Sequence, residues 1–525
     1  MTAGGPLPGV PAARPPRVRA RGGLAAGTLY NLVGQAAPLA VAYFAIPILT
    51  GQLGPARFGL LTLAWAVLGY FGLFDLGLGR ALTHSVADRL ARGRDDEIPS
   101  LVWTGLGLML VLGVVGAAVA TGLGPWFVDR VFKMPAELAP EARSAFLVLA
   151  LSIPVVIVST AIRGVLEAAQ RFDLVNAVRV PQGMLSFAGP VLVLPFSRSL
   201  TAIVVVLLAG RIAATGVWYW LMLRELPSLR QGARVTRASI APLLRFGSWM
   251  TVSNVVGPLM VTVDRFVIGA TAGVAAVAYY TAPWEAVTKL WMIPAALSGV
   301  LFPAFATAHA SDPDRTRVLY VRGVKLTVLA VLPAVTLIYG FADVGLAAWL
   351  GPDYAVRSTP VLRWLAAGLL LNCVAQIPFA LVQGSGRPDV TAKLHLVELP
   401  LYGAALWWLT GAYGITGAAI AWTLRAGLDS VALLAFAQRL APVGRRTAFR
   451  AAAMIATGSA VAVGLAAAPL VAWMKLGVAV SLVACGAAAA WAVVLSGTDR
   501  DRARALAAGA ELWVGRRPRA VGGRR

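Results

Sequence analysis

The amino-acid sequence predicts an all-α polytopic membrane protein with about fourteen transmembrane helices. More than ten apolar stretches recur along the 525 residues, and many are about 20 residues long, enough to cross a hydrocarbon core of about 30 Å. Mean hydropathy is +0.75, and only 13% of the residues are charged. The loops between the apolar stretches alternate between arginine-rich and nearly neutral. Little of the chain is left for soluble-domain chemistry, so we expect the function to lie among the helices.

The limits of the apolar runs define fourteen expected spans. They are Leu29–Leu49, Phe58–Gly79, Pro99–Leu123, Ser144–Ile162, Val175–Phe196, Leu200–Leu223, Leu243–Ala270, Val277–Ala306, Val321–Leu350, Val361–Gln383, Val390–Leu409, Gly414–Ala437, Ala451–Trp473 and Leu476–Leu495. Prolines inside several spans predict kinks, which neighbouring helices or a wet cavity can accommodate. The stretch Arg163–Pro181 is basic and amphipathic, and we expect it to lie on the inner membrane surface before the fifth span begins.

The charges of the loops predict the orientation. With the N-terminus inside, 34 of the 46 Lys and Arg residues fall in cytoplasmic segments, seven in outer segments and five within spans. Cytoplasmic loops accumulate Lys and Arg, so this bias favours an N-in, C-in topology. It also explains the net charge of +23 without a nucleic-acid partner.

An internal repeat divides the predicted bundle. LGPARFGLLTLAWAV, from Leu53, aligns with AGVAAVAYYTAPWEA, from Ala272, and QRFDL from Gln170 resembles SGRPDV from Ser385 with a small slip. The repeat spans six helices, which predicts two parallel six-helix lobes around a central cavity, a plan common among transporters. We expect a disordered basic cytoplasmic tail over residues 1–27, an N-lobe over 28–225, a C-lobe over 240–440, two further helices over 447–496 and a basic tail over 497–525.

The sequence gives no sign of a cofactor or a metal site. The two cysteines lie inside apolar spans, and the three histidines are far apart in the sequence. No GxxxxGK[ST] phosphate-binding loop occurs, so ATP hydrolysis is not expected.

Four motifs carry a resemblance to a known family. They are LGPARFGL, FDLGLGRALT from Phe74, VLEAAQRFDL from Val165, and VDRFVIG from Val263 followed by VAYYTAP. With these motifs the chain resembles the Wzx-like polysaccharide flippases of the multidrug/oligosaccharidyl-lipid/polysaccharide exporter superfamily. The resemblance implies a two-lobed bundle in a bacterial plasma membrane that moves lipid-linked oligosaccharide by alternating access. It also implies contact with membrane lipids, polysaccharide polymerase and export machinery. A lipid II flippase, a multidrug exporter and, more distantly, a membrane glycosyltransferase or ligase stay open as alternatives.

Polar groups within the spans are the candidate functional residues, because a charge at membrane depth costs several kcal/mol. The expected cavity residues that bind cargo are Arg211, Arg265, Lys289, Asn31, Gln35 and Asn254. The expected coupling or gating residues are Asp75, Arg80, Asp264 and Glu285.

Most of these candidates also have a structural interpretation. Glu285 and Lys289 are four residues apart and can form a structural ion pair. Arg80 can be an interfacial anchor at the inner surface, and Asp264 with Arg265 can anchor the outer interface. The amides of the first and seventh spans can serve interhelical hydrogen bonds. Arg211 differs, since it has no carboxylate within four residues and needs an anion or a partner on another helix.

Overall fold

A computed structural model describes residues 24–70, 77–231 and 259–444, together with isolated positions between 453 and 481. Within these residues every regular element is a helix, and eight helical segments are long and apolar enough to cross a membrane. The prediction of an all-α polytopic membrane protein is therefore confirmed. The number of fourteen spans stays a prediction.

The chain forms two compact units, which are described separately. Unit 1 comprises Met1–Ala282 and His395–Ala418, and unit 2 comprises Pro283–Leu394 and Ala419–Arg525. The predicted lobe boundaries at residues 225 and 240 stay a prediction.

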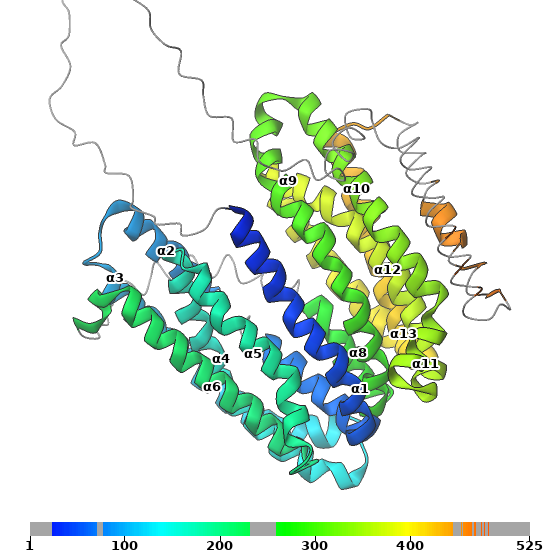
Figure 1. Ribbon diagram of the computed structural model, residues 1–525, viewed down its shortest axis with the longest axis horizontal. Coiled ribbons are helices and arrows are strands. Elements are labelled where there is room, and N and C mark those ends of the chain that lie inside the picture. The colour runs from blue at the N-terminus through cyan, green and yellow to red at the C-terminus, as the bar shows by residue number, and fades with distance from the viewer. Residues whose placement is uncertain are drawn as a thin grey trace, which may run out of the picture. The chain divides into compact units, whose positions relative to one another are not determined.

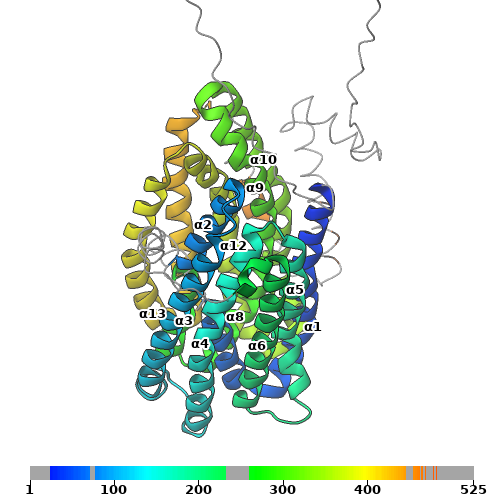
Figure 2. The same cartoon turned by 90° about the vertical axis from the view of Figure 1, so that its left-hand side faces the viewer.

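Unit 1 is built mainly from six helices. They are α1 (Leu24–Tyr70), α2 (Leu78–Arg92), α3 (Ile98–Trp126), α4 (Ala139–Ala168), α5 (Phe172–Val193) and α6 (Leu200–Glu225). Helix α4 packs against α2, α3 and α6, while α5 packs against α1 and α6 (Figures 1 and 2). Leu82, Met109, Ile157 and Trp218 form part of a buried apolar core between α2, α3, α4 and α6.

Unit 2 is centred on α12 (Pro352–Gly384). It also holds α9 (Met292–Ser311), α10 (Pro313–Gly340), α11 (Ala342–Leu350), most of α13 (Pro388–Leu440) and the end of α8 (Val274–Thr288). Helix α12 packs against α9, α10 and α11 (Figure 1). The core of unit 2 contains the buried side chains of Phe305, Tyr320, Ile377 and Leu381.

Two spans that the sequence predicts as single helices are interrupted in unit 2. The predicted span Val277–Ala306 is broken by a 3-10 turn at Lys289–Trp291, just before Pro294 removes a backbone donor. The predicted span Val321–Leu350 is divided at Phe341, where φ is −109° and ψ is 16°. Each stretch is apolar on average, so mean hydropathy alone could not locate the breaks.

Glycines with positive φ mark matching points of the internal repeat. Helix α1 consists of two helices joined at Gly54, whose φ of 72° and ψ of 167° are non-helical. Gly273, its partner in the sequence alignment, has a φ of 95°. A side chain with a Cβ is strongly disfavoured in these conformations, which explains why glycine occurs at both positions. Gly414 divides α13 in the same way, with a φ of 58°.

The segments QRFDL and SGRPDV form the same turn, 216 residues apart. In the first turn, the N–H of Gln170 donates to the carbonyl of Glu167 and that of Arg171 to the carbonyl of Leu166. In the second turn, the N–H of Gly386 donates to Gln383 and that of Arg387 to Val382. Each turn is a Schellman motif, with a positive-φ residue after the helix end (Gln170, 57°; Gly386, 77°).

An arginine then closes each turn onto an aspartate two residues later. Arg171 pairs with Asp173 at 2.8 Å and with Glu225 at the end of α6, and Arg387 pairs with Asp389 at 3.1 Å. The hydrogen bond from Arg171 is the main reason why the pKa of the Asp173 carboxyl lies below its ordinary value.

The expectation that Arg163–Pro181 lies along the inner surface is wrong. Helix α4 continues to Ala168 and α5 begins at Phe172, so only the turn separates them. Polar residues in this stretch suggested a surface position, but several of them face a cavity between helices, as described next.

Candidate functional site

Unit 1 encloses a cavity of about 550 Å³ between α1, α2, α4, α5 and α6. It lies between α4 and α5, toward the end at which the turn after Ala168 connects these two helices. Its charged lining residues are Arg80, Arg163, Glu167, Arg179 and Arg211. Four arginines and one glutamate give the lining a formal charge of +3, so the cavity favours an anionic ligand.

The four arginines come from four different helices. Arg80 lies in the first turn of α2, Arg163 in the last turns of α4, Arg179 in the first half of α5 and Arg211 near the middle of α6. Within the described residues, no carboxylate lies within ion-pair distance of Arg80, Arg179 or Arg211. Arg163 lies close enough to Arg211 for the two guanidinium groups to repel each other. An anion between them would relieve this repulsion.

Hydroxyl and amide groups complete the lining. They belong to Thr83, Ser159, Thr160, Gln182 and Ser186. The four hydroxyls donate to carbonyls of their own helices at 2.7–3.1 Å. Their oxygens keep lone pairs that can accept hydrogen bonds from a polyhydroxylated ligand, and the Gln182 amide can donate as well as accept.

A close helix contact forms one wall of the cavity. Gly164 on α4 lies against α2, and a Cβ built at Gly164 would come within 2.3 Å of the Thr83 Oγ1 atom. The absence of a side chain at this position lets the two helices approach and places Arg163 beside the residues of α2. Trp218 of α6 is buried against the same region.

The structure brings together only some of the residues that the sequence singled out. Arg211 and Arg80 share the cavity, although Arg80 was expected to serve coupling or anchoring. Asp75 and Asn254 lie outside the described residues. Asn31 and Gln35 belong to α1, but their side chains lie outside the described part of the structure.

Arg265 and Lys289 do not line this cavity. Asp264 is buried, accepts a hydrogen bond from the Tyr280 hydroxyl at 2.6 Å and accepts another from the Arg265 backbone N–H at 2.7 Å. Lys289 forms an ion pair with Glu285 at 2.7 Å, one helical turn away in unit 2. This is the geometry expected of a structural ion pair between two residues of one helix.

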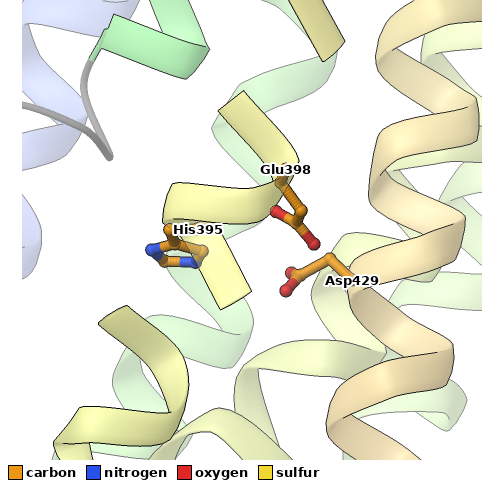
Figure 3. A group of neighbouring side chains, drawn as sticks. All are labelled: His395, Glu398 and Asp429. Carbon is orange, nitrogen blue, oxygen red and sulfur yellow. The ribbon is translucent and has the colours of Figure 1, made fainter. Parts of the chain in front are cut away.

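One carboxylate within a predicted span lies close to a histidine in the sequence. Glu398 follows His395 by three residues, so the two side chains lie on adjacent turns of α13 (Figure 3). Figure 3 also draws Asp429, which belongs to unit 2.

Sequence reasoning also missed Arg163, Glu167 and Arg179 as cavity residues. The signal was present in the sequence. Arg163 and Glu167 are four residues apart at the end of an apolar helix, and Arg179 lies two residues before Pro181 in the next helix. The basic character of the whole stretch obscured it, since a basic amphipathic segment is also typical of a membrane surface.

Comparisons with known proteins agree on a family. A family model described as polysaccharide biosynthesis protein matches residues 24–309. A putative O-antigen transporter of Shigella flexneri is 30% identical over 406 residues, which cover 77% of this chain and 96% of that protein. The lipopolysaccharide biosynthesis protein WzxC of Escherichia coli (strain K12) is 23% identical over 69% of this chain and 70% of its own.

Solved structures share the fold. The lipid II flippase MurJ, in an inward closed conformation, has a TM-score of 0.67 at 10% identity and covers 89% of this chain and 100% of its own. An inward-facing multidrug resistance MATE transporter of the MOP superfamily has a TM-score of 0.64 at 17% identity, over 78% of this chain and 98% of its own. Taken together, the family model, the transporter relatives and the fold show that the chain belongs to the polysaccharide biosynthesis protein family, within the fold of the MOP superfamily.

Proposed function

We propose that this protein is a flippase that moves polyprenyl-diphosphate-linked oligosaccharide, the repeat unit of a polysaccharide, from the inner to the outer leaflet of a bacterial plasma membrane. The observation that carries the proposal is the arginine-lined cavity of unit 1. The names of the relatives, an O-antigen transporter and a lipopolysaccharide biosynthesis protein, support the same cargo class.

The chemistry of the cavity matches the polar head of such a cargo. A guanidinium presents a planar set of donors that binds phosphate oxygens in pairs, and each charge-assisted hydrogen bond contributes about 1.5–3 kcal/mol. Hydroxyl and amide groups on α4 and α5 can meet sugar hydroxyls. The prenyl chain, being as apolar as the bilayer interior, would stay in lipid.

The predicted topology gives the cavity a place in the transport cycle. With the N-terminus inside, the α4–α5 turn is cytoplasmic and the cavity lies in the inner half of the membrane, where newly made cargo resides. Two parallel lobes that rock against each other would then expose the bound head to the outer side. No catalytic step is needed for this function, and the protein is proposed not to be an enzyme.

The other candidate residues keep separate proposed roles. Buried Asp264, with its tyrosine partner, and Glu285 are proposed to couple the movement to an ion, as is Asp75. Arg265, Lys289, Asn31, Gln35 and Asn254 are proposed to line the path of the cargo beyond the cavity of unit 1. Polysaccharide polymerase and export machinery are the proposed partners.

The rival functions differ in the ligand they require. A multidrug exporter for cationic compounds would need an acidic cavity, whereas this one carries a formal charge of +3. A lipid II flippase shares the fold and would also bind a diphosphate, so the glycan of the cargo separates it from the proposed function.

Substitution of Arg211 tests the proposal in cells. In a flippase-deficient strain that this gene complements, Arg211→Ala should lower polysaccharide export by at least about tenfold, because about 1.4 kcal/mol corresponds to a factor of ten. Arg211→Lys should restore part of the loss, since it keeps the charge without the planar fork.

Arg224→Ala is the matched control. Arg224 lies on the same helix but stacks over Trp220 and does not line the cavity. It should support export near the wild-type level. Export by Arg211→Ala equal to that of Arg224→Ala, at equal protein level, would contradict the proposal.

A further inference from the structure

Among the described residues that line the arginine cavity, Glu167 is the one carboxylate. It lies one turn after Arg163 on α4, and its Oε1 is 3.4 Å from the Nε of Arg163. Both side chains are 35% exposed, so the pair is open to the cavity rather than sealed within the packing. Glu167 is the penultimate residue of α4, and its position is fixed by the turn, because its carbonyl accepts the hydrogen bond from the Gln170 N–H.

The ion pair leaves Arg163 with unused hydrogen-bonding capacity. The Nε of Arg163 is buried and makes no hydrogen bond, although it lies within ion-pair distance of Glu167. A well-formed arginine–carboxylate pair is bidentate and has N–O distances of about 2.7–2.9 Å. The contact with Glu167 is longer and single. An incoming phosphate group could therefore offer Arg163 better contacts than Glu167 does.

Glu167 and an anionic head would also repel each other. Both require the same guanidinium, and in a half-buried cavity two negative charges a few ångströms apart are poorly screened. Arg211, which Arg163 repels, would gain from an anion bound between the two guanidinium groups. The cavity thus contains an internal anion beside the place where an external one would bind.

We propose that Glu167 is a resident counter-anion that competes with the diphosphate of the cargo for Arg163. This inference rests on the proposed function and adds a residue that tunes affinity at the same site. In the empty cavity Glu167 pairs with Arg163. When the diphosphate binds, Arg163 turns to it and Glu167 loses its partner. The cost of breaking the pair weakens binding, and the returning Glu167 helps to expel the cargo at the outer side. A flippase needs this balance, since a head bound too tightly is not released.

The binding of farnesyl diphosphate, a short prenyl diphosphate, tests the competition. The full-length protein is placed in nanodiscs of neutral phosphatidylcholine, and binding is measured by calorimetry. Glu167→Gln should bind farnesyl diphosphate about two- to fivefold more tightly than wild type, the range expected for a partly exposed ion pair. Inorganic diphosphate, measured in parallel, shows whether the gain belongs to the phosphate groups alone. If Glu167→Gln does not fold, Glu167→Ser is measured with the same expectation.

Two controls separate competition from a general change in charge. Glu97→Gln makes the same substitution in a glutamate that pairs with Arg89 outside the cavity, and it should leave binding unchanged. In an Arg163→Gln background, Glu167→Gln should no longer tighten binding, because the competed group is gone. An equal gain in that background, an equal gain in Glu97→Gln, or no gain in Glu167→Gln would each overturn the role of Glu167.

The wild-type measurement distinguishes this role from the function on which it rests. Wild-type protein that binds farnesyl diphosphate but no more tightly in the Glu167→Gln variant retains its proposed function and loses the competition. Wild-type protein that binds farnesyl diphosphate no better than uncharged farnesol contradicts the cargo itself.

Discussion

The turn after α4 and the turn after α12 have the same backbone but stand beside different charges. Both are Schellman motifs closed by an Arg–Asp pair. On the helix before the first turn stand Arg163 and Glu167, and the positions 216 residues later hold Phe379 and Gln383. The repeat thus preserves the scaffold while the charges change. This difference teaches that the repeated part of the sequence specifies the fold, and that the charges found in only one copy mark the site.

The largest expected effect comes from replacing Arg163 and Glu167 by the residues found at the equivalent positions before the second turn, Phe379 and Gln383. The double variant Arg163→Phe/Glu167→Gln keeps the turn but removes a guanidinium from the cavity. Loss of one charge-assisted contact of about 1.5–3 kcal/mol should lower transport by about ten- to a hundredfold. Complementation of a flippase-deficient strain measures the loss.

The reciprocal variant Gln383→Glu serves as the control. It adds a charge beside the second turn at a residue that is not among those lining the cavity, and export should stay near the wild-type level. If both variants export equally well, the charges of the first copy have no special role.

A glycine at the cavity wall gives the next effect. Gly164 corresponds to Ala380 in the second copy, so only the first copy lacks room for a methyl group. Gly164→Ala should destabilise the protein by about 1–3 kcal/mol, because the new Cβ overlaps the Thr83 side chain. Thermal unfolding in detergent measures this loss, and Thr83→Ala in the same chain should recover part of it.

Gly216→Ala is the control variant for Gly164→Ala. A Cβ at Gly216 on α6 would meet nothing within 4 Å, so the better helix propensity of alanine should leave stability unchanged or raise it by up to about 1 kcal/mol. Equal losses at both glycines would show that the contact between α2 and α4 is not tight.

A smaller difference is expected between the two closing arginines. Arg171 has two carboxylate partners, Asp173 and Glu225, whereas Arg387 has Asp389. Exposed ion pairs contribute little to stability, so Arg171→Ala should lower the unfolding temperature only slightly more than Arg387→Ala. A larger loss at Arg387 would reverse the ranking of the two turns.

The pH dependence of the first turn should be the smallest effect. The pKa of Asp173 is lowered in the folded protein, so its pair with Arg171 stabilises the protein at neutral pH and is lost as pH falls through the folded-state pKa. The stability difference between wild type and Asp173→Asn should therefore shrink on acidification below the ordinary range of an aspartate. A difference that stays constant through the acidic range would argue against the pair.

Much of the fold was predictable because hydropathy is a property of local sequence. The apolar runs located most helices, and the alignment of Gly54 with Gly273 identified two equivalent turns. The break at Phe341 and the 3-10 turn at Lys289 were not predictable, because they interrupt stretches that are apolar on both sides. Packing against neighbouring helices, rather than composition, determines such breaks.

The site was predictable only in part. Arg211 was recognised because a charge in the middle of a span, with no carboxylate nearby in sequence, needs a partner elsewhere. Arg163 and Arg179 were missed because they lie in a basic stretch that resembles a surface segment. Only the packing of α2, α4, α5 and α6 brings these arginines to one cavity, and that convergence depends on contacts such as Gly164 against α2.

Transport by the purified protein is the most direct test of the central claim. The protein is reconstituted into liposomes that contain a fluorescent prenyl-diphosphate-linked sugar, and an impermeant quencher reports how fast the probe crosses the bilayer. The account predicts that wild type and Arg224→Ala move the probe at similar rates, while Arg211→Ala is at least about tenfold slower. Equal rates for wild type and Arg211→Ala, or a wild-type rate no faster than that of protein-free liposomes, would contradict it.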